Sequence, residues 1–148
     1  MYRNILIATD GSTLAEKAVS HGLGLAKSVG AKVTAVCVET PFNVFAVPES
    51  RIRQMSEEFA QHNAAIKRHA SKVLGDVAEA AKKAGVSCDT VQREDEQPYQ
   101  AIIKTAKEKG CDAIIMASHG RSGISAVLLG SVTNKVLTHT DIPVVVVH

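Results

Sequence analysis

Glycines and small polar residues gather in one stretch of the chain, residues 113–133. The apolar run 113–117 predicts a buried strand, and a polar loop with Gly120 and Gly123 follows it. Gly130-Ser131 then directly precedes a helical pattern. The free N–H groups and partial positive charge of a helix N-terminus suit a bound anion, often a phosphate. The stretch therefore predicts a nucleotide-phosphate site. The alternative is that the loop glycines only turn the chain and the serine only caps the helix.

Four side chains in this stretch or near the first strand could take part in chemistry, namely Asp10, His119, Arg121 and Ser131. Asp10 could contact a ligand or cap the first helix, and Arg121 could contact a phosphate or belong to the surface. His119 could act as an acid or base, or as a solvated hydrogen-bond donor. No nucleophile with an oriented base and no acidic pair for a catalytic metal accompanies them.

Well-known catalytic and phosphate-binding motifs do not occur in the sequence. A P-loop requires Gly-Lys followed by Ser or Thr, and a dinucleotide fingerprint requires three spaced glycines after the first strand. The sequence has neither, and it has no G-x-S-x-G nucleophile elbow. Any phosphate site here must use a different pattern.

Strand and helix patterns alternate along the whole chain, from β to α and back, through nine elements. This alternation predicts an α/β protein with a parallel sheet, helices on both faces and right-handed crossovers. Ligands bind such sheets beyond the carboxyl ends of the strands, where the strand order reverses. We expect strands one and four to flank that point, which places residues 9–11 and 118–120 together at the ligand-binding edge of the sheet. The expected strands are 5–8, 32–38, 86–92, 113–117 and 144–147, and the expected helices are 13–29, 49–84, 98–109 and 132–139.

Length and composition indicate one ordinary domain of 148 residues, with 45% hydrophobic and 22% charged residues. The net charge is +2, the basic residues are dispersed, and aromatic residues are sparse, which argues against a nucleic-acid partner. No apolar run approaches the roughly 18 residues that span a bilayer, and the N-terminus has no signal-peptide profile. The three cysteines, Cys37, Cys88 and Cys111, form no C-x-x-C pair, so we expect buried reduced thiols and a cytoplasmic protein without a zinc site.

Three segments give the whole chain a resemblance to the universal stress protein family. These are the opening strand with its acidic end, 5–12, the segment 129–133 and the apolar end 142–147. The ATP-binding branch of that family has the pattern G-x2-G-x9-G-[ST]. Gly120, the nine residues after it and Gly130-Ser131 match its second part, whereas Ala117 takes the place of the first glycine. The expected fold is a Rossmann-like five-stranded parallel sheet of order 3-2-1-4-5, in a single universal stress protein domain formed by residues 1–148.

The resemblance implies a site for ATP. Residues after strand one would contact adenine and ribose, strand two would pack on the adenine, and the end of strand four would offer backbone groups. The two glycine segments would hold the phosphates, with Mg²⁺ or Mn²⁺ bound through those phosphates and not by a protein metal site. Gly123 is included although it lies outside the glycine pattern. The implied nucleotide-binding residues are Ala8, Thr9, Asp10, Val38, Met116, Ala117, Ser118, His119, Gly120, Arg121, Ser122, Gly123, Gly130, Ser131, Val132 and Thr133.

The resemblance also implies a homodimer through the strand Val144–Val147, whose apolar edge would otherwise invite aggregation. The alternative is an edge covered by a helix of the same chain. The function that we expect is a cytosolic stress-response module regulated by ATP. A nucleotide-free stress-response dimer, and a slow ATPase or autophosphorylating enzyme, stay open as alternatives. The loop 39–50 could decide the choice of a protein partner.

Overall fold

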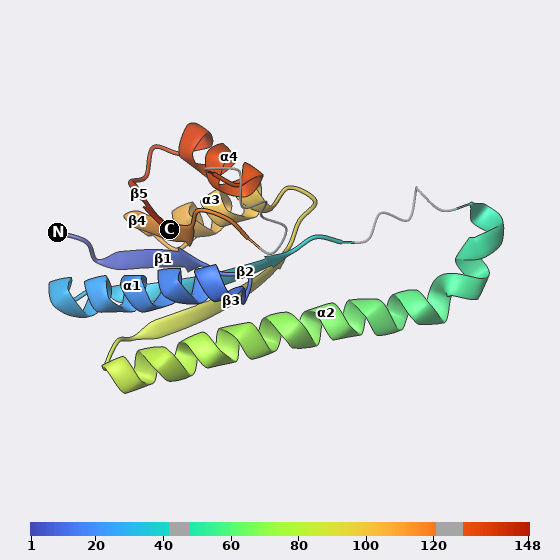
Figure 1. Cartoon of the computed structure of the whole chain (residues 1–148), viewed down its shortest axis with the longest axis horizontal. Helices are drawn as coiled ribbons and strands as arrows, with labels where there is room; N and C mark the ends of the chain where they lie inside the picture. Colours follow the sequence, from blue (N-terminus) through green and yellow to red (C-terminus); the bar gives the residue numbers. More distant parts are fainter. Residues whose placement is uncertain (42–47, 121–128) are drawn as a thin grey trace.

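A five-stranded parallel sheet forms the centre of the molecule, in the order β3-β2-β1-β4-β5 (Figure 1). The structure is a computed structural model that describes residues 1–41, 48–120 and 129–148, with only the backbone described at 52–54. The predicted fold class and strand order are confirmed. The elements are β1 (Asn4–Ala8), α1 (Thr13–Val29), β2 (Lys32–Glu39), α2 (Glu49–Ala84), β3 (Cys88–Glu94), α3 (Pro98–Glu108), β4 (Ala113–Ala117), α4 (Ser131–His139) and β5 (Val144–Val147).

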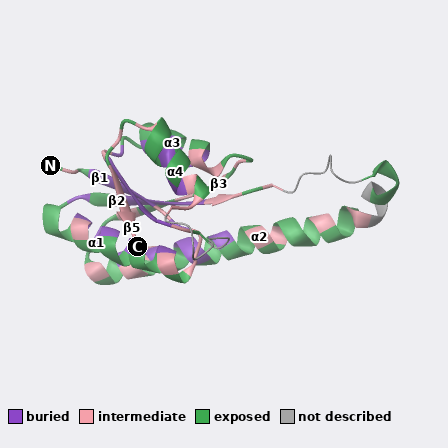
Figure 2. Cartoon of the chain, turned by 45° about the horizontal axis from the view of Figure 1, so that its top comes forward, coloured by how far each residue is buried: buried purple, intermediate pink, exposed green. Residues whose placement is uncertain are grey.

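Two apolar layers cover the two faces of the sheet, because successive side chains of a strand point to opposite faces. Ile5 and Ile7 of β1 pack with α1 and α2, whereas Leu6 between them packs with α3 and α4. All three side chains are fully buried. Figure 2 shows the buried residues concentrated in the sheet and on the inner sides of these helices. The neighbouring strands β1 and β4 are therefore rigid supports for the loops that follow their carboxyl ends.

Capping residues fix where the helices begin and end. The Ser12 hydroxyl accepts a hydrogen bond from the Ala15 N–H, as expected for the N-cap of α1. Gly30 and Gly85 end α1 and α2 with φ values of 70° and 74°. The third strand begins two residues later than predicted, at Cys88. The reason is that the Val86 N–H still donates to Ala81 O at 2.9 Å and closes the end of α2.

The two outer strands differ in character. β3 lies at one edge, and its largely polar side chains are exposed or half-buried. β5 lies at the other edge and pairs with β4 alone among the strands of the described chain. Its four valines are half-buried. Helices of the same chain therefore leave the β5 side chains partly accessible.

Helix α2 is much longer than the strands it covers, and this corrects one expectation. The sequence predicts a single apolar stripe from Met55 to Ala84. The buried residues begin only at Ala70, and Met55, Phe59 and Ile66 are half-buried. A helix of 36 residues is about 54 Å long at 1.5 Å per residue, so it outruns a sheet with strands of eight residues or fewer. Its N-terminal half extends beyond the sheet (Figures 1 and 2).

The three cysteines are free thiols, with Cys37 and Cys111 buried and Cys88 half-buried, so the expectation of burial is wrong for Cys88. Burial raises the pKa of the Cys88 and Cys111 thiols, which favours their neutral form. Among the described residues, no helix has the length and apolar character that a membrane crossing requires.

Candidate functional site

A cavity of about 570 Å³ opens beyond the carboxyl ends of β1, β2 and β4. The strand order reverses between β1 and β4, so the cavity lies at the position where open α/β sheets bind ligands. Twelve of the residues predicted from the sequence line it, namely Ala8, Thr9, Asp10, Val38, Met116, Ala117, His119, Gly120, Gly130, Ser131, Val132 and Thr133.

The loop after β1 forms one wall of the cavity. The Thr9 hydroxyl accepts from the Gly11 N–H at 3.3 Å, and Asp10 Oδ1 accepts from the Ser12 N–H at 2.9 Å. The helix cap of α1 is Ser12 and not Asp10, so the alternative of Asp10 as the cap is wrong. A Cβ atom at Gly120 would lie 2.7 Å from Asp10 Oδ2. The Asp10 carboxylate thus holds the first loop with one oxygen and faces the second loop with the other.

The start of α4 forms the opposite wall. The Gly130 N–H donates to Ser118 O at 2.6 Å, and a Cβ atom at Gly130 would lie 3.2 Å from that oxygen. Gly130 is the N-cap, and Ser131 is the first helical residue, so the alternative of Ser131 as the cap is wrong. The N-cap glycine has no side chain to bond the first-turn N–H groups of α4. Those N–H groups have no partner within the helix, and a ligand anion in the cavity can accept from them.

Two buried hydroxyl residues fix this wall to the sheet. Thr133 Oγ1 donates to Ala117 O at 2.8 Å and holds the first turn of α4 on the end of β4. Ser118 is 2% exposed and does not line the cavity, unlike the other described residues of the predicted set. Its N–H donates to Val147 O, and its hydroxyl lies 3.0 Å from His119 Nδ1. Ser118 therefore positions its neighbours more than it presents groups to a ligand.

The sequence did not predict the contribution of α3 to the cavity. Pro98 and Ile102, in the first two turns of this helix, line the cavity. Val36 also lines it, two residues before Val38 on the same side of β2. The strand period of two could have found Val36. No local sequence pattern indicates that α3 packs beside the cavity. The lining residues that were not predicted are Ala15, Val36, Thr40, Pro98, Ile102 and Leu129.

The cavity has an apolar end and a polar end. Val36, Val38, Ile102 and Met116 supply an apolar surface of the kind that holds a planar ring. Asp10, the glycines and the start of α4 supply polar groups opposite. The described residues contain no group of three His, Cys, Asp or Glu side chains that could hold a metal ion. Three residues of the predicted site, Arg121, Ser122 and Gly123, lie outside the described residues, as does the 42–47 part of the loop 39–50.

The fold and the cavity together define a Rossmann-like α/β protein with a cavity at the switch point of the sheet. The sequence model of the universal stress protein family matches residues 1–148, and the chain belongs to this family. It is 31% identical over 155 residues to the universal stress protein YxiE of Bacillus subtilis, with 99% of both chains covered. It is 30% identical over 147 residues to the universal stress protein MJ0531 of Methanocaldococcus jannaschii, with 99% of this chain and 82% of the relative covered.

Solved structures share the fold over nearly the whole chain. Hypothetical protein MJ0577 is 28% identical with a TM-score of 0.81, covering 99% of this chain and 96% of that one. A universal stress protein in complex with cAMP is 23% identical with a TM-score of 0.70, covering 99% and 97%. The universal stress protein of Archaeoglobus fulgidus in complex with dAMP is 20% identical with a TM-score of 0.69, covering 99% and 98%.

Proposed function

We propose that the chain is a stress-response protein that binds ATP as a regulatory module, within one domain formed by residues 1–148. The observation that carries the proposal is the pair of glycines at the polar end of the cavity. A side chain at Gly120 would meet the Asp10 carboxylate, and one at Gly130 would meet the Ser118 carbonyl. Both positions allow backbone to approach a ligand closely beside the start of α4.

The two ends of the cavity suggest how ATP is oriented. The adenine occupies the apolar end, against Val38 and Ile102. The ribose lies near Asp10, whose carboxylate can accept hydrogen bonds from hydroxyl groups. The phosphates lie between Gly120 and the start of α4, and we include Arg121, Ser122 and Gly123 in this part of the site. Ala117 fits the pattern because it is 7% exposed at the end of β4, where a methyl group is accommodated.

A divalent ion fits the site only through the nucleotide. Asp10 is the one carboxylate among the described lining residues. The described residues do not form a group of three or more His, Cys, Asp or Glu side chains that could hold a metal ion there. Mg²⁺ usually binds through one or two carboxylates together with substrate phosphates. We therefore propose that Mg²⁺ or Mn²⁺ binds with ATP, where it would neutralise phosphate charge. The complexes of the two distant relatives with cAMP and dAMP support adenine nucleotides as the ligand class.

Mass spectrometry of the freshly purified chain tests the proposal without added ligand. We expect an adenine nucleotide to be released when the protein is denatured. The same preparation of a Gly120→Val variant is the control, because its side chain would displace Asp10 and fill the polar end. Equal nucleotide in both preparations would show that the retained molecule occupies another place.

We also propose that the protein is a cytoplasmic homodimer joined through β5. Free cysteines with raised thiol pKa values are compatible with a reducing compartment. The outer edge of β5 presents backbone groups that a second copy can pair with. Light scattering during size-exclusion chromatography should give twice the chain mass of 15.7 kDa. Val146→Lys should shift this mass toward the monomer, and an unchanged mass would argue for a different interface.

A further inference from the structure

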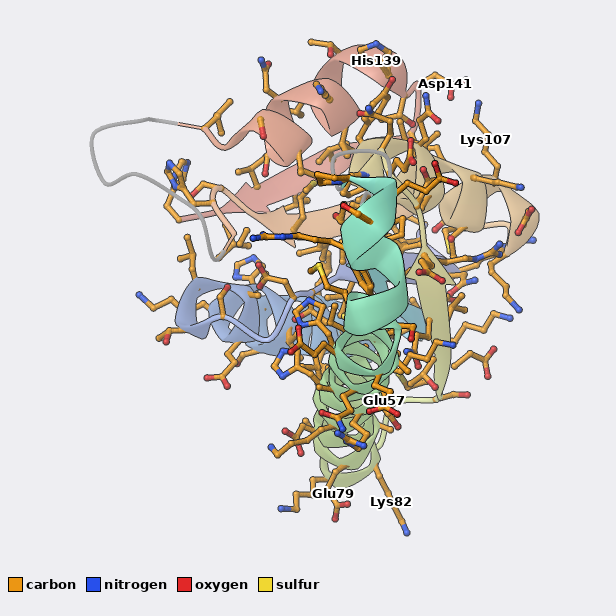
Figure 3. The ribbon with its side chains drawn as sticks, turned by 90° about the vertical axis from the view of Figure 1, so that its right-hand side faces the viewer. Glu57, Glu79, Lys82, Lys107, His139 and Asp141 are labelled. Carbon is orange, nitrogen blue, oxygen red and sulfur yellow. The ribbon has the colours of Figure 1, made fainter. Side chains whose placement is uncertain are left out.

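The first part of α2, residues 49–69, forms an arm that leaves the body of the protein. None of its described side chains is buried. At 1.5 Å per residue the arm is about 31 Å long, and Figure 1 shows it extending beyond the ends of the strands. In Figure 3, which looks along α2, Glu79 and Lys82 of the later part point away from the sheet. A described contact with the body lies near the C-terminal end of the arm, where Gln92 Nε2 of β3 donates to Lys67 O at 3.3 Å.

The root of the arm lies against the loop that forms one wall of the cavity. Ala70, Val73 and Leu74 are the first buried residues of α2. A Cβ atom at Gly11 would lie 2.6 Å from Val73 Cγ2 and 3.4 Å from His69 Nε2. Gly11 has a φ of 80°, which also favours glycine. The backbone of the loop therefore packs directly on the turn of α2 where burial begins.

The same loop carries the cavity residues Thr9 and Asp10. The Thr9 hydroxyl bonds the Gly11 N–H, and Asp10 Oδ1 bonds the Ser12 N–H, so the position of Gly11 is set by its neighbours on both sides. A ligand that contacts Asp10 is one residue away from Gly11, where a Cβ atom would lie 2.6 Å from Val73 Cγ2. Fixing Asp10 therefore fixes the support of the arm.

We propose that α2 responds to the occupancy of the cavity, through the contact of Gly11 with Val73 and His69. The identity of the ligand rests on the proposed function, whereas the mechanical link does not. A helical segment with no fully buried side chain among those described depends largely on its own backbone hydrogen bonds, so packing at the root limits how far fraying of the arm extends. A ligand that holds the loop slows this fraying. By thermodynamic linkage, if the ligand stabilises the packed root by a certain factor, the packed root strengthens binding of the ligand by that same factor.

Hydrogen exchange of the ligand-free protein tests the link itself. Gly11→Ala places a methyl group against Val73, whereas Gly30→Ala has a similar φ of 70° and no atom within 4 Å of its Cβ position. We expect amides of residues 62–74 to exchange at least about threefold faster in Gly11→Ala. Gly30→Ala should leave these amides unchanged. Equal exchange in both variants would overturn the proposed link.

Exchange with saturating ATP and Mg²⁺ tests the response to ligand. In the unmodified protein we expect residues 66–76 to exchange at least about threefold more slowly with ATP. Val73→Ala should lose this protection, and Val77→Ala, buried one turn further from Gly11, should keep it. Protection of residues 9–12 without protection of α2 would overturn the inference. If ATP protects neither segment, the proposed function fails. The comparison of Gly11→Ala with Gly30→Ala without ligand still tests whether the loop supports α2.

Discussion

Gly130→Val should weaken ATP binding at least ~100-fold, or about 2.7 kcal/mol, while the chain stays folded. A Cβ atom at this position would lie 3.2 Å from Ser118 O and 3.4 Å from His119 Cα, so a branched side chain must turn toward the cavity or displace the loop. The Gly130 N–H bond to Ser118 O would also lengthen. Calorimetric titration with ATP gives the affinity, and circular dichroism gives the melting temperature.

Gly24→Val is the matched control for this substitution. Gly24 lies in α1, and no atom is within 4 Å of its Cβ position. We expect this variant to bind ATP as the unmodified protein does. If Gly130→Val retained full affinity with a normal melting temperature, the start of α4 would not be the phosphate site.

Ile115→Ala should lower the free energy of unfolding by about 3–4 kcal/mol. Ile115 is 0% exposed and lies in β4, which pairs with both β1 and β5. Truncation to alanine leaves a cavity beneath α1 that the close-packed sheet cannot fill by moving. Urea denaturation followed by circular dichroism measures the change.

Leu137→Ala serves as the control for loss of the same number of carbon atoms. Leu137 is 38% exposed on α4, so its truncation should cost less than about 1 kcal/mol. Similar losses in the two variants would mean that β4 is not the centre of the core. Such a result would also remove the rigid support that the cavity requires.

Local patterns in the sequence were sufficient to locate most of the strands, whereas the full strand order came from the family resemblance. Apolar runs mark β1, β2, β4 and β5, and Gly30 and Gly85 end α1 and α2, so these bounds followed from few residues. Both cavity walls could also be predicted, because the rule for open α/β sheets places the ends of β1 and β4 together. Asp10 and Gly130 therefore line the same cavity although 120 positions separate them.

Features that depend on packing between distant elements could not be predicted. The stripe of α2 is continuous in sequence, and only the size of the sheet decides that burial starts at Ala70. Ile102 appeared as an ordinary core residue of α3, because nothing local indicates that this helix reaches over the cavity. The Asp10 carboxylate faces Gly120 across two loops that are far apart in the sequence, and no local pattern indicates this approach.

Isothermal titration of the nucleotide-free protein with ATP and Mg²⁺ tests the central claim most directly. We expect saturable binding of one ATP per chain, and loss of that binding in Gly130→Val but not in Gly24→Val. Absence of binding at millimolar ATP, in protein shown by circular dichroism to be folded, would contradict the claim.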